Sequence, residues 1–315
     1  MDIHLDPLIK YFKGMLRYEA FSPDSSSVTE FKQCARRYFY RYVLGYKPRE
    51  DEPYFKWGST IHKFFECLEV YYARGKSVEE CFALAYRDTM IFWGDTPDVQ
   101  IESQWSFITK ARLSKTLQVI AEDWKREKAR GTIKVIATEQ PFNVTFPNGV
   151  RRSGRFDQMI QTNRRLWGRD IKSTSQEKTY FKRQLYPNDQ FATYTVAQSI
   201  LNGLDVANGQ FLAGQYVAVV FNNLGTKKEP EKGGPALYTE IVSFTPSALS
   251  KWLEEAKYWD NQMKYAREND IYPMNEKQCT FCKYRKVCSS SSDMSMMMTL
   301  KSEYKHEVWD NTKTD

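Results

Sequence analysis

Apolar residues recur at three- and four-residue intervals along the first part of the chain, which is the period of an amphipathic helix. The capping box Ser27-Val28-Thr29-Glu30 predicts a helix that runs to about Leu44, where Gly45 ends it. The same pattern predicts three more helices, near 58–73, 78–92 and 102–129. We therefore expect residues 63–130 to form a helical insertion ahead of a sheet.

From about Ile133 the pattern changes to the two-residue alternation of β-strands. Strands are predicted over Ile133–Phe146 and Val150–Ile160, and the turn Pro147-Asn148-Gly149 between them favours a type I′ hairpin. A third strand ends at Lys172. The remaining elements are a helix at 190–201, strands at 215–222 and 237–244, and a helix at 247–268. The chain thus combines a sheet with helices before and after it.

Charged side chains occur in two short strands that flank a polar turn near residues 161–164, namely Gly154–Ile160 and Leu166–Lys172. Asp157 lies near the middle of the first strand, and Asp170 lies near the end of the second. Because strand side chains alternate between faces, Asp170 and Lys172 point the same way. Two carboxylates and an ammonium group suit a hard divalent cation such as Mg²⁺ or Mn²⁺. A solvated hairpin is the alternative, since the Asp-x-Lys spacing alone is common.

The length of 315 residues suffices for one large domain or two small ones with a sizeable core. Hydrophobic residues make up 41%, and the mean hydropathy of -0.63 fits a soluble protein. No apolar run approaches the roughly 18 residues of a membrane span, and the start MDIHLDPLIK has no secretory pattern. We expect a cytoplasmic protein with no membrane partner, whose cysteines are ligands or core residues rather than disulfides.

The net charge is +7 and the sequence pI is about 8.9, a moderate basic excess. Arginines gather at 36–37, 151–155 and 164–169, and aromatic residues make up 15% of the chain. Clustered cations favour a polyanionic partner such as DNA, because binding releases phosphate counterions, and aromatic rings can stack on unpaired bases. Solvated surface charge and a core of aromatic residues explain the same observations equally well.

Two further motifs flank the carboxylate strands in chain order. Gly58-Ser59-Thr60-Ile61-His62 lies upstream, and Gln190 and Tyr194, which share one helical face, lie downstream. A structural histidine and a core tyrosine are the simpler interpretations of each motif alone. The order G-x-x-x-H, G-R-F-D, D-I-K and Q-x-x-x-Y, however, resembles the RecB-like branch of the PD-(D/E)xK nuclease superfamily.

This resemblance implies a restriction-endonuclease-like α/β (α+β) fold, with a mixed central sheet flanked by helices, in a single domain over residues 1–288. It implies a divalent metal site, in which the Ile171 carbonyl would be a fourth ligand beside the side chains His62, Asp157 and Asp170. Lys172 would position the attacking water, and Gln190 and Tyr194 would line the active site and contact DNA. Relatives often carry an acidic residue where Glu139 stands, but a purely structural role for Glu139 remains open.

The cysteines form a second group. Cys279, Cys282 and Cys288 lie within ten residues, one thiolate short of a four-thiolate metal site, and Cys34 can supply the fourth. This split pattern resembles the iron–sulfur staple of AddB-type and CRISPR-adaptation nucleases, although the Cys-Pro found in relatives is Cys34-Ala35 here. The resemblance implies a [4Fe–4S] cluster that ties the two ends of the domain together, with Zn²⁺ as the alternative. Cys67 and Cys81 fit helical core positions.

The sequence therefore predicts a Mg²⁺- or Mn²⁺-dependent deoxyribonuclease. The resemblance implies an exonuclease that acts on single-stranded DNA or DNA ends in recombination, repair, or phage or defence DNA processing, with a helicase acting in trans as a partner. One alternative is a catalytically silent, nuclease-like DNA-binding subunit of a helicase–nuclease complex, and another is a zinc-stapled binding module. No phosphate-binding G-x-x-x-x-G-K-[ST] loop and no G-x-S-x-G elbow occurs in the sequence. Residues 289–315 lack apolar periodicity, and we expect a flexible tail there.

Overall fold

The computed structural model describes residues 22–49, 53–101, 106–162, 165–176, 178–222 and 234–310. Contacts between Cα atoms divide the chain into two compact units. We call Asp51–Phe142 with Arg155–Ser250 the sheet unit, and Met1–Glu50, Asn143–Gly154 and Lys251–Asp315 the cysteine unit. The single domain expected over residues 1–288 stays a prediction. The lead-in before residue 22, the turn positions 163–164 and the loop at 223–233 lie outside the described residues.

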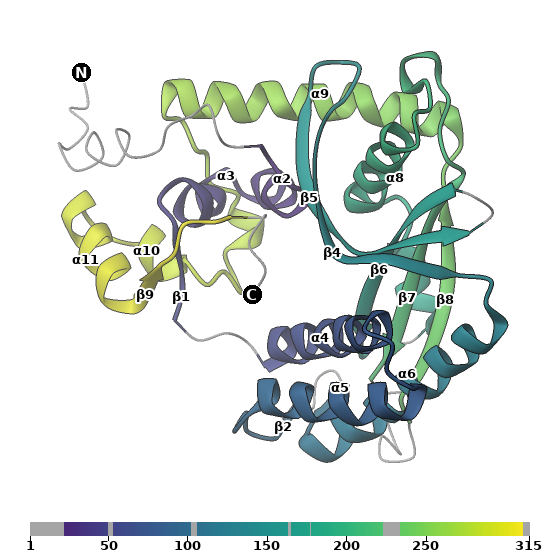
Figure 1. Cartoon of the computed structure of the whole chain (residues 1–315). Helices are drawn as coiled ribbons and strands as arrows, with labels where there is room; N and C mark the ends of the chain where they lie inside the picture. Colours follow the sequence, from purple (N-terminus) through teal and green to yellow (C-terminus); the bar gives the residue numbers. More distant parts are fainter. Residues whose placement is uncertain are drawn as a thin grey trace. The chain divides into compact units, whose positions relative to one another are not determined.

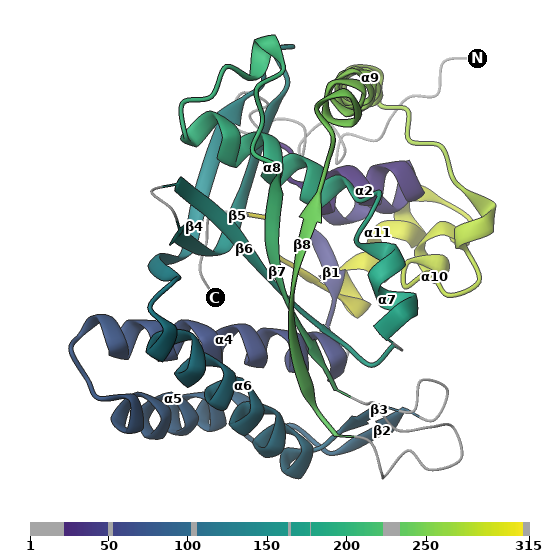
Figure 2. The ribbon, with the colours of Figure 1, turned by 90° about the vertical axis from the view of Figure 1, so that its right-hand side faces the viewer.

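A five-stranded mixed sheet in the order β4-β5-β6-β7-β8 is the frame of the sheet unit (Figures 1 and 2). β5 and β6 are antiparallel, β6 and β7 are parallel, and β7 and β8 are antiparallel. The parallel pair needs a crossover, which the chain makes through two helices. The strands are β4 (Lys134–Thr145), β5 (Arg151–Thr162), β6 (Arg165–Thr174), β7 (Gly214–Phe221) and β8 (Ala236–Ser243). β4 and β5 contribute residues to both units.

Helices cover both faces of this sheet, because β7 is apolar on both sides. Ala218 and Val220 pack with α4 (Pro53–Ala73), α5 (Val78–Trp93) and α6 (Lys110–Arg130). The alternate residues Val217, Val219 and Phe221 pack with the crossover helices α7 (Lys178–Gln184) and α8 (Asp189–Leu201). A small hairpin of β2 (Val99–Ile101) and β3 (Ser106–Ile108) precedes α6. The mixed sheet flanked by helices is consistent with the restriction-endonuclease-like fold predicted from the sequence.

The cysteine unit contains short helices and a two-stranded sheet. Its elements are α2 (Ser25–Gln33), α3 (Ala35–Tyr38), a π-helical turn (Phe39–Val43), β1 (Tyr46–Pro48), residues of α9 (Pro246–Asn269) from Lys251 on, a 3₁₀ turn (Glu276–Gln278), α10 (Arg285–Cys288), α11 (Asp293–Glu303) and β9 (Tyr304–His306). β1 pairs with β9 in antiparallel fashion. Met297, Leu300 and Tyr304 are buried there with Tyr40 and Tyr284.

Three expectations about local structure differ from what is observed. The helix expected over 27–44 is interrupted at Cys34, whose backbone is extended (φ -162, ψ 107), and Asp24 rather than Ser27 is its N-cap. The helix expected from residue 102 begins at Lys110, because Thr109 caps it and the preceding residues form β3. Only Gly149 has positive φ in the turn after β4, so the turn is not type I′, which needs positive φ at both central residues.

The tail expected at 289–315 also differs, since residues up to 306 include α11 and β9. Its ordering comes from partners far away in the sequence. The Tyr304 hydroxyl donates to the Lys283 carbonyl, and β9 pairs with β1. The α11 sequence places Met and Leu among Ser and Lys without an apolar stripe, so sequence periodicity does not reveal this contact. None of the described helices combines the length and apolar character needed to cross a membrane.

A buried ion pair joins α4 to α6 and provides a test of this packing. The Glu69 carboxylate accepts from Trp124 Nε1 at 2.8 Å and from Lys128 Nζ at 2.7 Å, and both charged side chains are buried. We expect Glu69→Gln to lower the free energy of unfolding by about 3–5 kcal/mol, because the Lys128 ammonium loses its counter-charge. Urea unfolding followed by circular dichroism measures this. Glu79→Gln in the exposed Glu79–Lys125 pair is the control, and we expect a change of less than about 1 kcal/mol. Equal effects of the two substitutions would contradict the prediction.

Candidate active site

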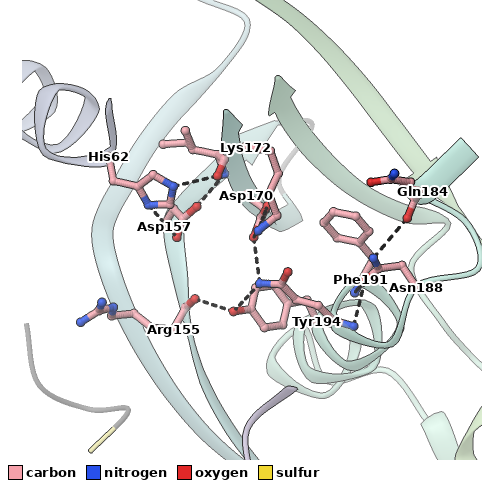
Figure 3. Close-up of polar contacts among 11 residues, drawn as sticks. His62, Arg155, Asp157, Asp170, Lys172, Gln184, Asn188, Phe191 and Tyr194 are labelled. Carbon is pink, nitrogen blue, oxygen red and sulfur yellow. Dashed lines mark hydrogen bonds and ion pairs between the residues drawn. The ribbon is translucent and has the colours of Figure 1, made fainter. Parts of the chain in front are cut away.

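His62 lies on α4, in the helix predicted near 58–73, and its side chain faces the sheet (Figure 3). Its Nε2 lies 2.8 Å from the Ile171 carbonyl oxygen, and its Nδ1 lies 3.6 Å from Asp157 Oδ1. A neutral imidazole that donates from Nε2 to the carbonyl keeps a lone pair on Nδ1. That lone pair then faces a carboxylate oxygen, and a cation between the two atoms would stabilise this arrangement.

Asp157 on β5 connects the two central strands. Its Oδ2 accepts a hydrogen bond from the Ile171 N–H of β6 at 2.6 Å, which leaves Oδ1 toward His62. The carboxylate is therefore oriented by the backbone of the neighbouring strand. The sequence placed Asp157 only near the middle of its strand, and the structure adds that Asp157 holds the peptide between Asp170 and Ile171.

Glu139 on β4 has a left-handed backbone with φ 49, which is unusual for a residue other than glycine. Buried and exposed positions in β4 change parity around it: Val135 and Ala137 are partly covered before it, whereas Phe142 and Val144 are buried after it. Such a change of parity is typical of a β-bulge, and bulges redirect side chains. The strained conformation costs about 1–2 kcal/mol, so the surrounding structure must stabilise it.

The redirected Glu139 carboxylate joins His62 and Asp157 in one cluster. One ligand atom from each of the three side chains lies within 4.8 Å of the other two, and all three are partly exposed. Among the described residues this is the one group of three metal-ligating side chains with that geometry. Imidazole nitrogen and carboxylate oxygen are ligands that Mn²⁺ accepts, so the donor set fits a divalent cation.

Burial and several neighbouring charges act on the pKa of Glu139. Burial raises its pKa, and the neighbouring Asp157 charge raises it further, while Arg155 and His62 oppose this shift. The Arg155 guanidinium Nε lies 2.6 Å from Glu139 Oε2. Arg155 thus partly neutralises the third carboxylate. The sequence placed Arg155 only within a basic cluster, because the partner lies on another strand and no local pattern connects the two.

Asp170 and Lys172 point the same way from β6, as strand alternation predicts. Lys172 Nζ lies 2.8 Å from Asp170 Oδ2 and 3.1 Å from Oδ1. Asp170 is only 1% exposed, and burial raises its pKa to about 6, with the Asp157 charge adding to the shift and Lys172 opposing it. Burial alone would lower the pKa of Lys172, but the charges of Asp170 and Asp157 outweigh it and raise that pKa.

Helix α8 supplies the remaining polar contacts. The Asn188 side chain accepts from the N–H groups of Gln190 and Phe191, and this cap begins the helix. Gln190 Nε2 then donates to Asp170 Oδ1 at 3.2 Å and to the Tyr194 hydroxyl at 3.3 Å. The Tyr194 hydroxyl in turn donates to the Arg155 carbonyl at 2.9 Å. The Q-x-x-x-Y pair therefore connects α8 to β5 and β6.

All the residues predicted for the active site belong to the sheet unit. Figure 3 labels His62, Asp157, Asp170, Lys172 and Tyr194 among them. The ligand roles predicted for His62, Asp157, Asp170 and the Ile171 carbonyl stay predictions. In the described residues the carboxylate that completes the compact cluster is Glu139, while Asp170 contacts Lys172 and Gln190. The sequence pointed to Glu139 only through the resemblance, because relatives often carry an acidic residue at its place in the first strand.

The four cysteines predicted to bind a cluster surround a cavity of about 200 Å³ in the cysteine unit. Cys34 reaches this cavity from the break between α2 and α3, and Cys279, Cys282 and Cys288 line it together with Arg37 and Arg285. Cys67 and Cys81 are buried in the helical core of the sheet unit, so the prediction of core positions for them is confirmed.

A model of the PD-(D/E)XK nuclease superfamily matches residues 21–289 of the chain. The chain belongs to this superfamily. No curated protein matches it. The chain is similar to the solved structure titled "Crystal structure of SSO0001", with 11% sequence identity and a TM-score of 0.31. The match covers 90% of this nuclease-superfamily chain and 97% of the chain in that structure.

A metal-binding measurement tests the role of Glu139 in this nuclease-superfamily site. We expect Glu139→Gln and Asp157→Asn each to weaken Mn²⁺ binding about tenfold or more, because each removes a charged oxygen from the compact cluster. Isothermal titration of the metal-free protein with Mn²⁺ measures the affinity. Glu240→Gln, in a pair with Lys182 on the same unit, is the control and should leave it unchanged. An unchanged affinity in Glu139→Gln alone would assign Glu139 a structural role.

Proposed function

We propose that the protein is a Mg²⁺- or Mn²⁺-dependent deoxyribonuclease that hydrolyses phosphodiester bonds of single-stranded DNA or DNA ends as an exonuclease. The observation that carries the proposal is the pairing of the Lys172 ammonium with the buried Asp170 carboxylate beside the His62, Glu139 and Asp157 cluster. Membership of the nuclease superfamily supports the same chemistry. The basic net charge of +7 suits a polyanionic substrate.

The residues divide the chemical work among them. A divalent cation would be held by His62, Asp157 and Glu139, with Asp170 and the Ile171 carbonyl as further oxygen ligands, and it would neutralise phosphate charge and acidify a bound water. Lys172 would hold the attacking water and stabilise the charge that develops on the phosphate oxygens. Its raised pKa keeps the ammonium form available for both tasks.

Gln190 and Tyr194 would act on Asp170 and on the DNA backbone. Gln190 donates to Asp170 Oδ1 and thereby limits rotation of the carboxylate. Tyr194 orients Gln190 through its hydroxyl oxygen and is itself held by the Arg155 carbonyl. Precise orientation matters because a misplacement of about 1 Å in an active site can cost on the order of 10²-fold in rate.

A cleavage assay with Lys172→Ala tests this proposal. We expect end-labelled single- and double-stranded DNA to be cleaved only with Mg²⁺ or Mn²⁺, and the substitution to reduce the rate by about 10²- to 10³-fold, because the transition-state charge loses its nearest cation. Lys182→Ala is the matched control, since this lysine lies on the same unit and pairs with Glu240.

The same assay distinguishes the alternatives. A circular single strand that stays intact while its linear form is digested would support the exonuclease assignment, and digestion of the circle would indicate an endonuclease. If the anaerobically purified wild type binds DNA but cleaves neither form, the proposal fails. The catalytically silent subunit, acting with a helicase in trans, would then take its place.

We further propose that Cys34, Cys279, Cys282 and Cys288 bind a [4Fe–4S] cluster, with Zn²⁺ as the alternative. The cavity of about 200 Å³ that the four cysteines line supports a bound metal group at this place. Arg37 lies close enough to Cys34 and Cys282 for their charges to act on its guanidinium, so it would offset part of the thiolate charge. The role would be mainly structural, since the cluster would close a very long loop.

Metal content and stability test the cluster. We expect anaerobically purified protein to be brown and to contain iron, and Cys34→Ser to lose both colour and iron and to melt at a lower temperature, because one of four ligands is gone. Elemental analysis, visible absorption and thermal melting measure these effects. Cys67→Ala, in the core of the sheet unit, should retain iron and colour. Zinc without iron in the wild type would favour the zinc alternative.

A further inference from the structure

A tight turn in the cysteine unit presents an exposed aromatic ring. The Cys282 N–H donates to the Cys279 carbonyl at 3.3 Å, which closes a four-residue turn with Phe281 in its third position. The Phe281 side chain is 96% exposed. The next most exposed large apolar side chain among the described residues is Ile91 at 71%. This degree of exposure in a folded region needs an explanation.

Hydrogen bonds and the packing of Tyr284 hold the backbone of this turn in place. The Arg285 N–H donates to the Cys282 carbonyl at 3.1 Å, which leads the chain into α10. Tyr284 is buried, its hydroxyl donates to the Tyr46 carbonyl at 2.6 Å, and its ring stacks on Tyr304. The ring of Phe281 is therefore presented by a backbone that is already ordered, so a ligand would pay little conformational entropy to use it.

The chain on both sides of Phe281 carries mainly cationic side chains. Between Glu276 and Lys286 the chain carries four exposed cations and one anion; the cations are Lys277, Lys283, Arg285 and Lys286. Lys286 pairs with Glu303 on α11. An apolar protein partner would match a surface with further apolar residues, because the anchors of protein interfaces lie in desolvated, apolar surroundings. One ring among several cations instead matches a ligand with a flat apolar face and a negatively charged backbone.

We infer that Phe281 stacks on an unpaired base of single-stranded DNA, with Lys277, Lys283 and Arg285 contacting the adjacent phosphates. Stacking platforms flanked by cations bind single strands without sequence preference, because every base has a π-face. The bases of a duplex are already stacked on one another, so they offer no free face to the Phe281 ring. The inference builds on the proposed function and adds to it a DNA contact in the cysteine unit, separate from the catalytic residues of the sheet unit.

An equilibrium binding measurement with oligo(dT) tests the ring. We expect Phe281→Ala to weaken binding about 5- to 100-fold and Phe281→Trp to retain or strengthen it, because base–aromatic stacking is lost only in the first variant. Fluorescence anisotropy in the Lys172→Ala background without divalent cations avoids cleavage. Tyr265→Ala, which removes a 56% exposed ring from α9, is the control and should bind normally. Equal binding by Phe281→Ala and the parent protein, or an equal loss in Tyr265→Ala, would overturn the inference.

The salt dependence tests the phosphate contacts independently. Each phosphate contact on a single strand contributes about 0.7 to the slope of log K against log salt, so Lys283→Ala with Arg285→Ala should reduce the slope by about 1.4. The double substitution Lys251→Ala with Lys264→Ala on α9 removes the same charge from the cysteine unit and should leave the slope unchanged. The same slope for the two double variants would contradict the phosphate contacts.

Photo-crosslinking gives a direct readout that does not depend on affinity. An oligo(dT) with one 5-iodouracil should crosslink to the tryptic peptide Gln278–Lys283, and mass spectrometry should place the bond on Phe281. Absence of this crosslink at saturating DNA would overturn the inference even if affinities fall. Failure of the proposed function is distinguishable, because it appears as a wild type that cleaves nothing, whereas failure here appears as unchanged binding, slope and crosslinking in a nuclease that still cleaves.

Discussion

The arrangement of the site depends on keeping several carboxylates ionised in a place where they have little contact with solvent. Asp170 is almost completely buried, and its ionised form is supported by Lys172 and Gln190. Asp157 uses one oxygen to accept a backbone N–H, and Glu139 shares its charge with Arg155. Burial disfavours the charged form of an acid, and a second carboxylate nearby disfavours it further. The carboxylates of Asp170, Asp157 and Glu139 therefore disfavour one another's ionised forms. A divalent cation bound among them would favour the ionised form of all three.

β4 and α8 supply the contacts that hold these carboxylates in place. Glu139 reaches the cluster only because β4 adopts a left-handed residue in mid-strand, and the strain is offset by the ion pair with Arg155. The chain of hydrogen bonds from Asp170 through Gln190 and Tyr194 to the Arg155 carbonyl then joins α8 to the central strands. Because Arg155 contributes both its side chain and its carbonyl, a single residue connects the bulged strand to the helix.

The sequence predicts those parts of the site that follow from strict periodicity. Strand alternation places Asp170 and Lys172 on one face, the spacing after Gly58 places His62 on α4, and the four-residue interval places Gln190 beside Tyr194. It does not predict the Glu139–Arg155 pair, because a bulge inverts the alternation on which the prediction relies. The sequence also does not predict the break in the helix at Cys34. The residues on both sides of Cys34 have helical periodicity, so the pattern gives no sign of the one extended residue between them.

The contacts around the cysteines bear on what a cluster would add to the fold. Tyr40, Tyr284 and Tyr304 pack with Leu300 in the core of the cysteine unit. The Arg36 N–H donates to the Pro273 carbonyl, and the Tyr284 hydroxyl donates to Tyr46, so the N- and C-terminal segments are joined by ordinary packing and hydrogen bonds. A cluster held by the four cysteines would add to these contacts, because it would restrict the opening of segments more than 200 residues apart in the sequence.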